Sequence, residues 1–147
     1  MKLRPSIVPL SLGGAFFVLG LLRLNDLSLY TDSTRYLLWA NSLAHLKGFV
    51  DESLPIPSRF VMNAPLYALI LMPSQIVSSL SVVSAKVWTL LFGALSVGLF
   101  FQWLRRYFGM ALAVGGTLFF AFNPMMLVIS TEVLSEAPFI AAWMMLL

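Results

Sequence analysis

Two long runs of residues without a single charge constrain this chain more than any other feature. They cover residues 87–104 (VWTLLFGALSVGLFFQWL) and 110–129 (MALAVGGTLFFAFNPMMLVI). A helix of ~20 apolar residues is about 30 Å long, which matches the hydrocarbon core of a bilayer. The whole chain is 60% hydrophobic and 10% charged, so a soluble domain would lack a wettable surface. We therefore predict an all-α, polytopic integral membrane protein in which both runs are spans.

Two further apolar runs lie near the ends of the chain. Residues 5–24 follow the basic start MKLRP, and we interpret them as a first span rather than a cleaved secretory signal, because no small-x-small cleavage site follows. Residues 138–147 are interpreted as the start of a further span that stops inside its apolar run. Pro124 lies within the run 110–129 and is expected to kink it. We therefore expect residues 1–147 to be the N-terminal part of one transmembrane domain.

The segment 64–84 is apolar but interrupted. Asn63 suits a helix N-cap and Pro65 a first helical turn. Pro73 is expected to interrupt the helix, and the part before it is about 14 Å long, too short to span. The part after Pro73 is rich in serine. We expect this segment to lie at the membrane surface or to re-enter it, so that residues 25–84 form one external loop.

The charged residues favour this topology through the positive-inside rule. Lys2 and Arg4 place the N-terminus in the cytoplasm, and Arg105 and Arg106 lie on a short turn that belongs on the same side. All the acids then share the external face: Asp26, Asp32, Asp51, Glu52, Glu132 and Glu136. If residues 64–84 do cross, the arginine pair moves outside and the last two acids move inside. The net charge of +3 is scattered, which does not suggest nucleic-acid binding.

The residues after the first apolar run show a helical period. A helix from Ser33 to Lys47 would separate two faces, ended by Gly48. One half carries Tyr36, Trp39, Ala40, Leu43, Ala44 and Leu46, and the other carries Thr34, Arg35, Asn41, Ser42 and His45, with Leu38 as the exception. We expect this helix to lie in the outer interface, with its apolar face toward the membrane and its polar face toward water.

The same stretch resembles the first external loop of GT-C class membrane glycosyltransferases, the dolichyl-phosphate-mannose protein mannosyltransferase-like (PMT-like) group. The family pattern has an Asp opening a surface helix, a Pro-Leu-Tyr element, a basic residue opening a span that ends in Arg-Arg-x-Phe-Gly, and a later external acid. The residues that fit are Asp32, Tyr36, Ala40, Ser42, Leu43, Ala44, Gly48, Phe49, Pro65, Leu66, Tyr67, Lys86, Arg105, Arg106, Tyr107, Phe108, Gly109 and Glu136. They occur in the family's order between about Tyr30 and Phe139.

Three positions depart from that pattern. Many relatives have Glu directly after the loop Asp, where this chain has Ser33. The usual Pro-Pro-Leu-Tyr is here Ala64-Pro-Leu-Tyr. Lys86 replaces the more usual Arg, so the planar two-pronged grip of a guanidinium on phosphate is lost.

The resemblance implies sugar transfer from a polyprenyl-phosphate-linked donor to an acceptor hydroxyl on the outer (periplasmic, extracellular or luminal) face. The protein would be an integral membrane protein, in the plasma or inner membrane if its source is prokaryotic, with its N-terminus in the cytoplasm. Its partners would be membrane lipids, the lipid-linked donor and a protein, lipid or glycan acceptor. No cofactor is certain, and a divalent metal is left open.

The resemblance also implies roles for individual residues. An inverting transfer needs a carboxylate to accept the proton of the acceptor hydroxyl, and positive charge to stabilise the departing phosphate. Asp32 is the candidate base, and Glu136 and Glu132 are the candidates to orient the acceptor or assist the base. The candidate phosphate contacts are Arg35, Arg59 and Lys86.

Simpler interpretations stand beside these roles. Asp32 suits a helix N-cap, which is compatible with catalysis. Arg35 could equally extend to lipid headgroups. Glu132 and Glu136 would be neighbours on one helix face and repel each other, or form an exposed acidic rim. No residues have metal-site spacing.

Two other functions remain open. Kinked spans and acids near the membrane would also suit a transporter or flippase for a lipid-linked substrate. A small structural membrane subunit without activity is the third alternative.

Overall fold

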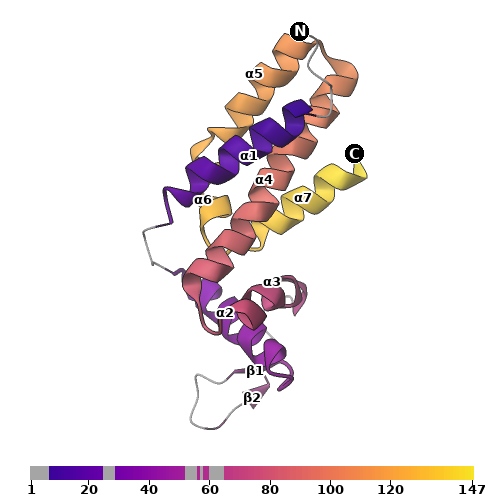
Figure 1. Ribbon diagram of the computed structural model, residues 1–147. Helices are drawn as coiled ribbons and strands as arrows, with labels where there is room; N and C mark the ends of the chain where they lie inside the picture. The colour runs from indigo at the N-terminus through magenta and orange to yellow at the C-terminus, as the bar shows by residue number, and fades with distance from the viewer. Residues whose placement is uncertain (1–6, 25–28, 52–55, 57, 60–64) are drawn as a thin grey trace.

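The computed structural model describes residues 7–24, 29–51, 56, 58–59 and 65–147 (Figure 1). These residues form helices and one two-stranded β ladder. The elements are α1 (Ile7–Leu21), α2 (Thr31–Ala44), β1 (Val50–Asp51), β2 (Ser58–Arg59), α3 (Pro65–Val77), α4 (Val82–Tyr107), α5 (Met110–Ala121), α6 (Pro124–Thr131) and α7 (Glu136–Leu146). The prediction of an all-α fold is confirmed for this part of the chain, with the short ladder as its only other regular element.

Helix α4 is the axis on which the other helices pack. It begins where the Ser81 hydroxyl accepts a hydrogen bond from the Ser84 N–H at 3.1 Å. It ends with Arg105 and Arg106 in its last turn, where positive charge is favourable for a helix dipole. Its 26 residues make it about 39 Å long. Figure 1 shows α1, α5 and α7 lying along it.

Glycines allow α1 and α4 to approach closely. A Cβ on Gly13 would lie 2.7 Å from the Ala94 carbonyl oxygen, and a Cβ on Gly98 would lie 3.2 Å from the Pro9 carbonyl oxygen. These pairs show that the two helices run antiparallel, so the start of α1 lies beside the end of α4. The buried core of this bundle consists of Phe16, Leu24, Leu90, Val97, Ala121, Met126 and Ile129.

The predicted kink at Pro124 is confirmed as a complete break. Helices α5 and α6 are bent by 61° relative to each other. The Asn123 side chain accepts a hydrogen bond from the Met125 N–H at 2.9 Å, and Pro124 occupies the first turn of α6. The break follows from local chemistry, because Asn caps a new helix and Pro suits its first position.

Among the described helices, α4 is long and apolar enough to cross a membrane. The bent pair α5 and α6 passes the same test when the two are taken together, whereas α1, α3 and α7 are shorter apolar helices. The polytopic arrangement and its orientation stay predictions.

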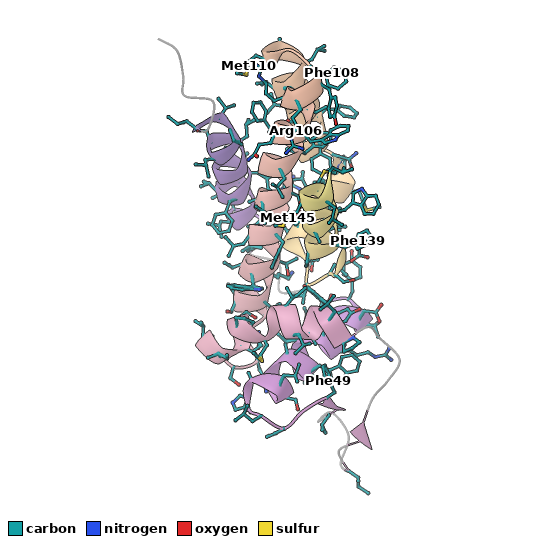
Figure 2. The ribbon with its side chains drawn as sticks, turned by 90° about the vertical axis from the view of Figure 1, so that its right-hand side faces the viewer. Phe49, Arg106, Phe108, Met110, Phe139 and Met145 are labelled. Atoms are coloured by element: carbon teal, nitrogen blue, oxygen red, sulfur yellow. The ribbon has the colours of Figure 1, made fainter. Side chains whose placement is uncertain are left out.

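Helices α2 and α3 form a separate layer at the end of the bundle where α4 begins (Figures 1 and 2). The apolar face of α2 packs against α3, with the rings of Tyr36 and Tyr67 4.8 Å apart and edge to face. Trp39 is 2% exposed. The prediction that this face lies toward the membrane is therefore wrong, because α3 covers it.

The polar face of α2 is also partly covered. Asn41 and Ser42 are buried, although the helical period placed them toward water. Asn41 Oδ1 accepts a hydrogen bond from the Ser79 hydroxyl at 2.7 Å, and Ser42 donates to the Gly48 carbonyl at 2.9 Å. Conversely Leu46, predicted on the apolar face, is 95% exposed. The chain after α3 returns over α2 and buries groups that an isolated helix would expose.

Both predicted boundaries of α2 also change. The helix spans Thr31–Ala44 rather than Ser33 to Lys47. Its C-terminal end comes earlier than predicted because Leu46 takes a positive φ of 60°, followed by Gly48 with a φ of 80°. Its N-cap residue is Tyr30, so the interpretation of Asp32 as the N-cap is wrong.

Helix α3 passes through Pro73, which was expected to interrupt it. Tertiary contacts hold both sides of this position: Leu71 before it is fully buried, and the Ser74 carbonyl after it accepts a hydrogen bond from the Ser84 hydroxyl of α4 at 2.8 Å. Packing therefore overrides the local preference of proline. The proposed Asn63 cap lies outside the described residues.

Candidate functional site

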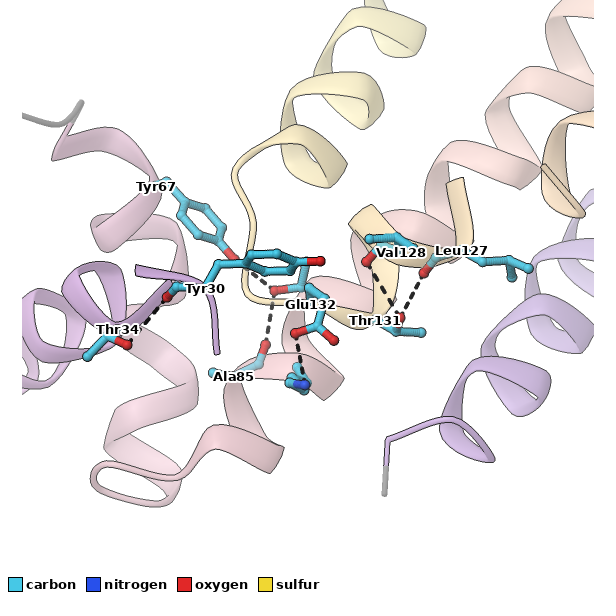
Figure 3. Close-up of polar contacts among 10 residues, drawn as sticks. Tyr30, Thr34, Tyr67, Ala85, Leu127, Val128, Thr131 and Glu132 are labelled. Atoms are coloured by element: carbon cyan, nitrogen blue, oxygen red, sulfur yellow. Dashed lines mark hydrogen bonds and ion pairs between the residues drawn. The ribbon is translucent and has the colours of Figure 1, made fainter. Parts of the chain in front are cut away.

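Segments far apart in the sequence meet where α4 begins. The residues between α6 and α7 pack against the α2–α3 layer through Val133, which is fully buried in one core cluster with Tyr36, Tyr67 and Ala85. Figure 3 shows Tyr30, from the start of α2, in the same region as Tyr67 and Glu132. The fold thus brings the elements bearing most of the sequence-predicted site residues to one end of the bundle.

A buried ion pair joins two of those residues. Lys86 Nζ on α4 lies 2.9 Å from Glu132 Oε2, and the two side chains are 1% and 14% exposed (Figure 3). Glu132 follows the last turn of α6, which ends as its N–H donates to the Val128 carbonyl at 3.0 Å. A lysine this deeply buried needs a compensating negative charge. Lys86, predicted as a phosphate contact, has a carboxylate as its partner here.

Tyr67 lies beside this pair and was not named as a site residue from the sequence. Its hydroxyl is 2.8 Å from Thr89 Oγ1, which in turn donates to the Ala85 carbonyl at 3.0 Å. Because the single hydroxyl hydrogen of Thr89 is used by Ala85, Tyr67 is the donor to Thr89. The Pro-Leu-Tyr match was the only sequence signal for it.

Burial is the main cause of a raised pKa for Tyr67. The hydrogen bond to Thr89 opposes this shift, whereas the negative charge of Glu136 adds to it. Tyr67 therefore stays neutral at physiological pH and can only act as a hydrogen-bonding group.

Asp32 and Arg35 lie on the accessible side of α2. Asp32 is in the first turn, where a negative charge is favourable for the helix dipole. Its Oδ1 is 3.8 Å from Arg35 Nη1, with side-chain exposures of 61% for Asp32 and 39% for Arg35. The two therefore offer a solvent-accessible carboxylate beside a guanidinium group.

Glu132 and Glu136 are not neighbours on one helix face, as the sequence had suggested. Glu132 is the residue that ends α6, and Glu136 is in the first turn of α7. Glu136 is exposed and Glu132 is bound to Lys86. Only Glu136 therefore presents an accessible carboxylate from this segment.

The remaining positions singled out in the sequence are Arg59, a predicted phosphate contact, and Ser33, which departs from the family pattern. Arg59 lies on β2, paired with Val50 of β1, and its side chain is outside the described residues. Ser33, where the family pattern has Glu, is fully buried, and its hydroxyl has no hydrogen-bond partner among the described residues. Within the described ranges no three His, Asp or Glu residues gather closely enough to hold a metal ion.

No protein-family model, curated protein or solved structure matches this chain.

Proposed function

We propose that this chain acts in a membrane glycosyltransferase of the GT-C kind, which moves a sugar from a polyprenyl-phosphate-linked donor to an acceptor hydroxyl. The observation that carries the proposal is the meeting of α2, the start of α4 and the α6–α7 turn at one end of the bundle. Those segments hold Asp32, Lys86 and Glu136, which match the family pattern in order. Arg105 and Arg106 lie at the other end of α4, as expected for a cytoplasmic pair.

The accessible groups have the chemistry that such a transfer needs. Asp32 is exposed enough to accept the proton of an acceptor hydroxyl, which makes it the proposed general base. Arg35 lies next to it and supplies positive charge for the departing phosphate. Glu136, at the start of α7, is the proposed group that orients the acceptor.

The buried ion pair has a different part in this proposal. Lys86 and Glu132 neutralise each other and hold the α6–α7 turn against α4. Their role is then to position Glu136 rather than to bind phosphate. The positive charge that stabilises the leaving phosphate in this proposal comes from arginine.

The test compares Asp32→Asn with Asp51→Asn in the whole protein in its native membranes. Undecaprenyl-phosphate-linked sugars with a labelled mannose or glucose serve as donors, and label is followed into the protein, lipid and glycan fractions. We expect Asp32→Asn to abolish transfer at an unchanged amount of membrane-inserted protein, and Asp51→Asn to retain it. Asp51 is the matched control because it is also an acid at this end, on β1.

Three results would contradict the proposal. Full transfer by Asp32→Asn would remove Asp32 as the base. Movement of labelled donor across the membrane without any glycosylated product would favour the transporter or flippase alternative. If no variant and no unsubstituted protein forms a glycosylated product, and substitutions of the external polar residues have no effect, a structural subunit is favoured.

A further inference from the structure

The end of α4 opposite the proposed site carries a small polar pocket. It has a volume of about 140 Å³ and lies between α4 and α7, lined by Leu99, Gln102, Trp103, Arg106, Met144, Met145 and Leu147. Arg106 is exposed at the edge of this pocket. Figure 2 shows Arg106 at this end of the molecule, together with Phe108 and Met110.

An apolar groove adjoins this pocket. The groove between α1 and α4 has a volume of about 730 Å³ and shares Leu99 and Gln102 with the polar pocket. Its other lining residues are Pro9, Leu10, Gly13, Gly14, Phe17, Leu91, Ala94, Leu95 and Gly98. Gln102 is thus the only polar side chain that lines the groove, and it lines the polar pocket as well.

The groove is apolar and the pocket beside it is polar, which is the polarity pattern of a lipid. Leu91, Leu95, Leu99, Gln102 and Arg106 recur every three or four residues, so they share one face of α4. The apolar part from Leu91 to Gln102 is about 16 Å long, roughly half of the ~30 Å hydrocarbon core and therefore one leaflet. Gln102 and Arg106, which also line the polar pocket, follow at the end of this stripe.

The charge at this end of the molecule is positive. Arg105 and Arg106 are adjacent and exposed, and the chain has no Asp or Glu between Glu52 and Glu132. The acidic residues of the described segments lie on α2, on β1 and around the α6–α7 turn, all toward the other end of α4. Trp103 and Tyr107, with ring centroids 5.7 Å apart, suit the interfacial layer beside the headgroups.

We propose that this face of α4 binds an anionic phospholipid, with its phosphate on Arg106 and Gln102 and one acyl chain in the groove between α1 and α4. The proposal rests on the membrane placement within the proposed function, but it does not depend on sugar transfer. The lipid fills an apolar surface on which Leu10 is 75% exposed and Leu91 is 44% exposed. It also places the end of α4 in the anionic leaflet.

The headgroup part is tested by native mass spectrometry of the whole protein in detergent. Phosphatidylglycerol and phosphatidylcholine with identical acyl chains are the probes. We expect phosphatidylglycerol to bind more tightly than phosphatidylcholine. Arg106→Gln should lower the affinity for phosphatidylglycerol about tenfold, which is the effect of losing one hydrogen bond to a charged group. Arg105→Gln is the matched control, since Arg105 has the same charge but does not line the pocket and donates to the Phe108 carbonyl.

The acyl-chain part is tested by filling the groove. A Cβ on Gly14 would meet nothing within 4 Å, and Gly14 lines the groove, so the side chain of Gly14→Leu starts in open space at the groove wall. We expect it to weaken binding of phosphatidylglycerol about tenfold. Gly115→Leu on α5 is the control, because Gly115 is equally open and does not line the groove.

Several results would overturn the proposal. Equal affinity for the two lipids, or equal losses of affinity in Arg106→Gln and Arg105→Gln, would contradict the headgroup part. Unchanged affinity for phosphatidylglycerol in Gly14→Leu would contradict the acyl-chain part. Mass spectra that show a second copy of the chain bound in place of lipid would contradict both. Asp32→Asn should bind phosphatidylglycerol like the unsubstituted protein. Lipid binding without sugar transfer would therefore contradict only the proposed function, and transfer without lipid preference would contradict only this inference.

Discussion

The ion pair between Lys86 and Glu132 gives the sharpest test of the packing. Its charges are 2.9 Å apart, which at an effective dielectric constant of about 20 gives an attraction of about 6 kcal/mol. Most of this offsets the cost of removing both charges from water, so the intact pair contributes little net stability. Removing one partner is different, because the other charge remains buried.

We expect Lys86→Met to lower the free energy of unfolding by about 3 kcal/mol, at the lower end of the range for a broken buried pair, because Glu132 is 14% exposed. The double variant Lys86→Met with Glu132→Leu removes both charges and should recover most of that loss. The assay is unfolding in mixed micelles of SDS and a mild detergent, followed by the fluorescence of the four tryptophans.

Lys47→Met is the control, because Lys47 is an exposed lysine at the same end of the molecule. It should change the free energy of unfolding by about 0.5 kcal/mol or less. The reasoning is refuted if Lys86→Met costs less than about 1 kcal/mol, or if the double variant loses as much as the two single variants added together.

Two further predictions concern packing and pH. A Cβ on Gly93 would overlap the Ser130 hydroxyl, so Gly93→Ala should destabilise the protein by about 1–3 kcal/mol in the same assay, whereas Gly115→Ala, with open space, should not destabilise it. Because folding raises the pKa of the Tyr67 hydroxyl, the unfolded chain loses this proton at a lower pH than the folded protein. The resulting contribution to the free energy of unfolding is fully present below about pH 10, the ordinary pKa of tyrosine, and is lost as the pH rises above it. Between pH 8 and 11 the free energy of unfolding should therefore fall more steeply in the unsubstituted protein than in Tyr67→Phe; equal slopes of this free energy against pH would contradict the raised pKa.

The sequence identified most elements that bear the candidate site but not their contacts. It named Lys86 as a phosphate contact and Glu132 as a group that orients the acceptor or assists the base, without indicating that the two pair. Tyr67 was visible only as part of a motif. Ion pairs and buried hydroxyl contacts between helices depend on how the helices pack, and no local pattern encodes them.

The errors on α2 have the same origin. A helical wheel assumes that one side of a helix is covered and the other is wet. Here α3 covers Tyr36, and the segment after α3 also buries Asn41 from the other side. The amphipathic period was present, but the surface that covers the helix was protein rather than membrane.

The sequence by itself determined the helical character of the chain, the break at Asn123–Pro124 and the separation of Arg105 and Arg106 from the acids along the chain. These features follow from hydropathy, backbone sterics and capping, which act over a few neighbouring residues. Only the tertiary structure decided that α3 continues through Pro73 and which polar residues are buried. It also decided that α4 and the α6–α7 turn meet through a buried ion pair, because such contacts exist only once distant helices have packed together.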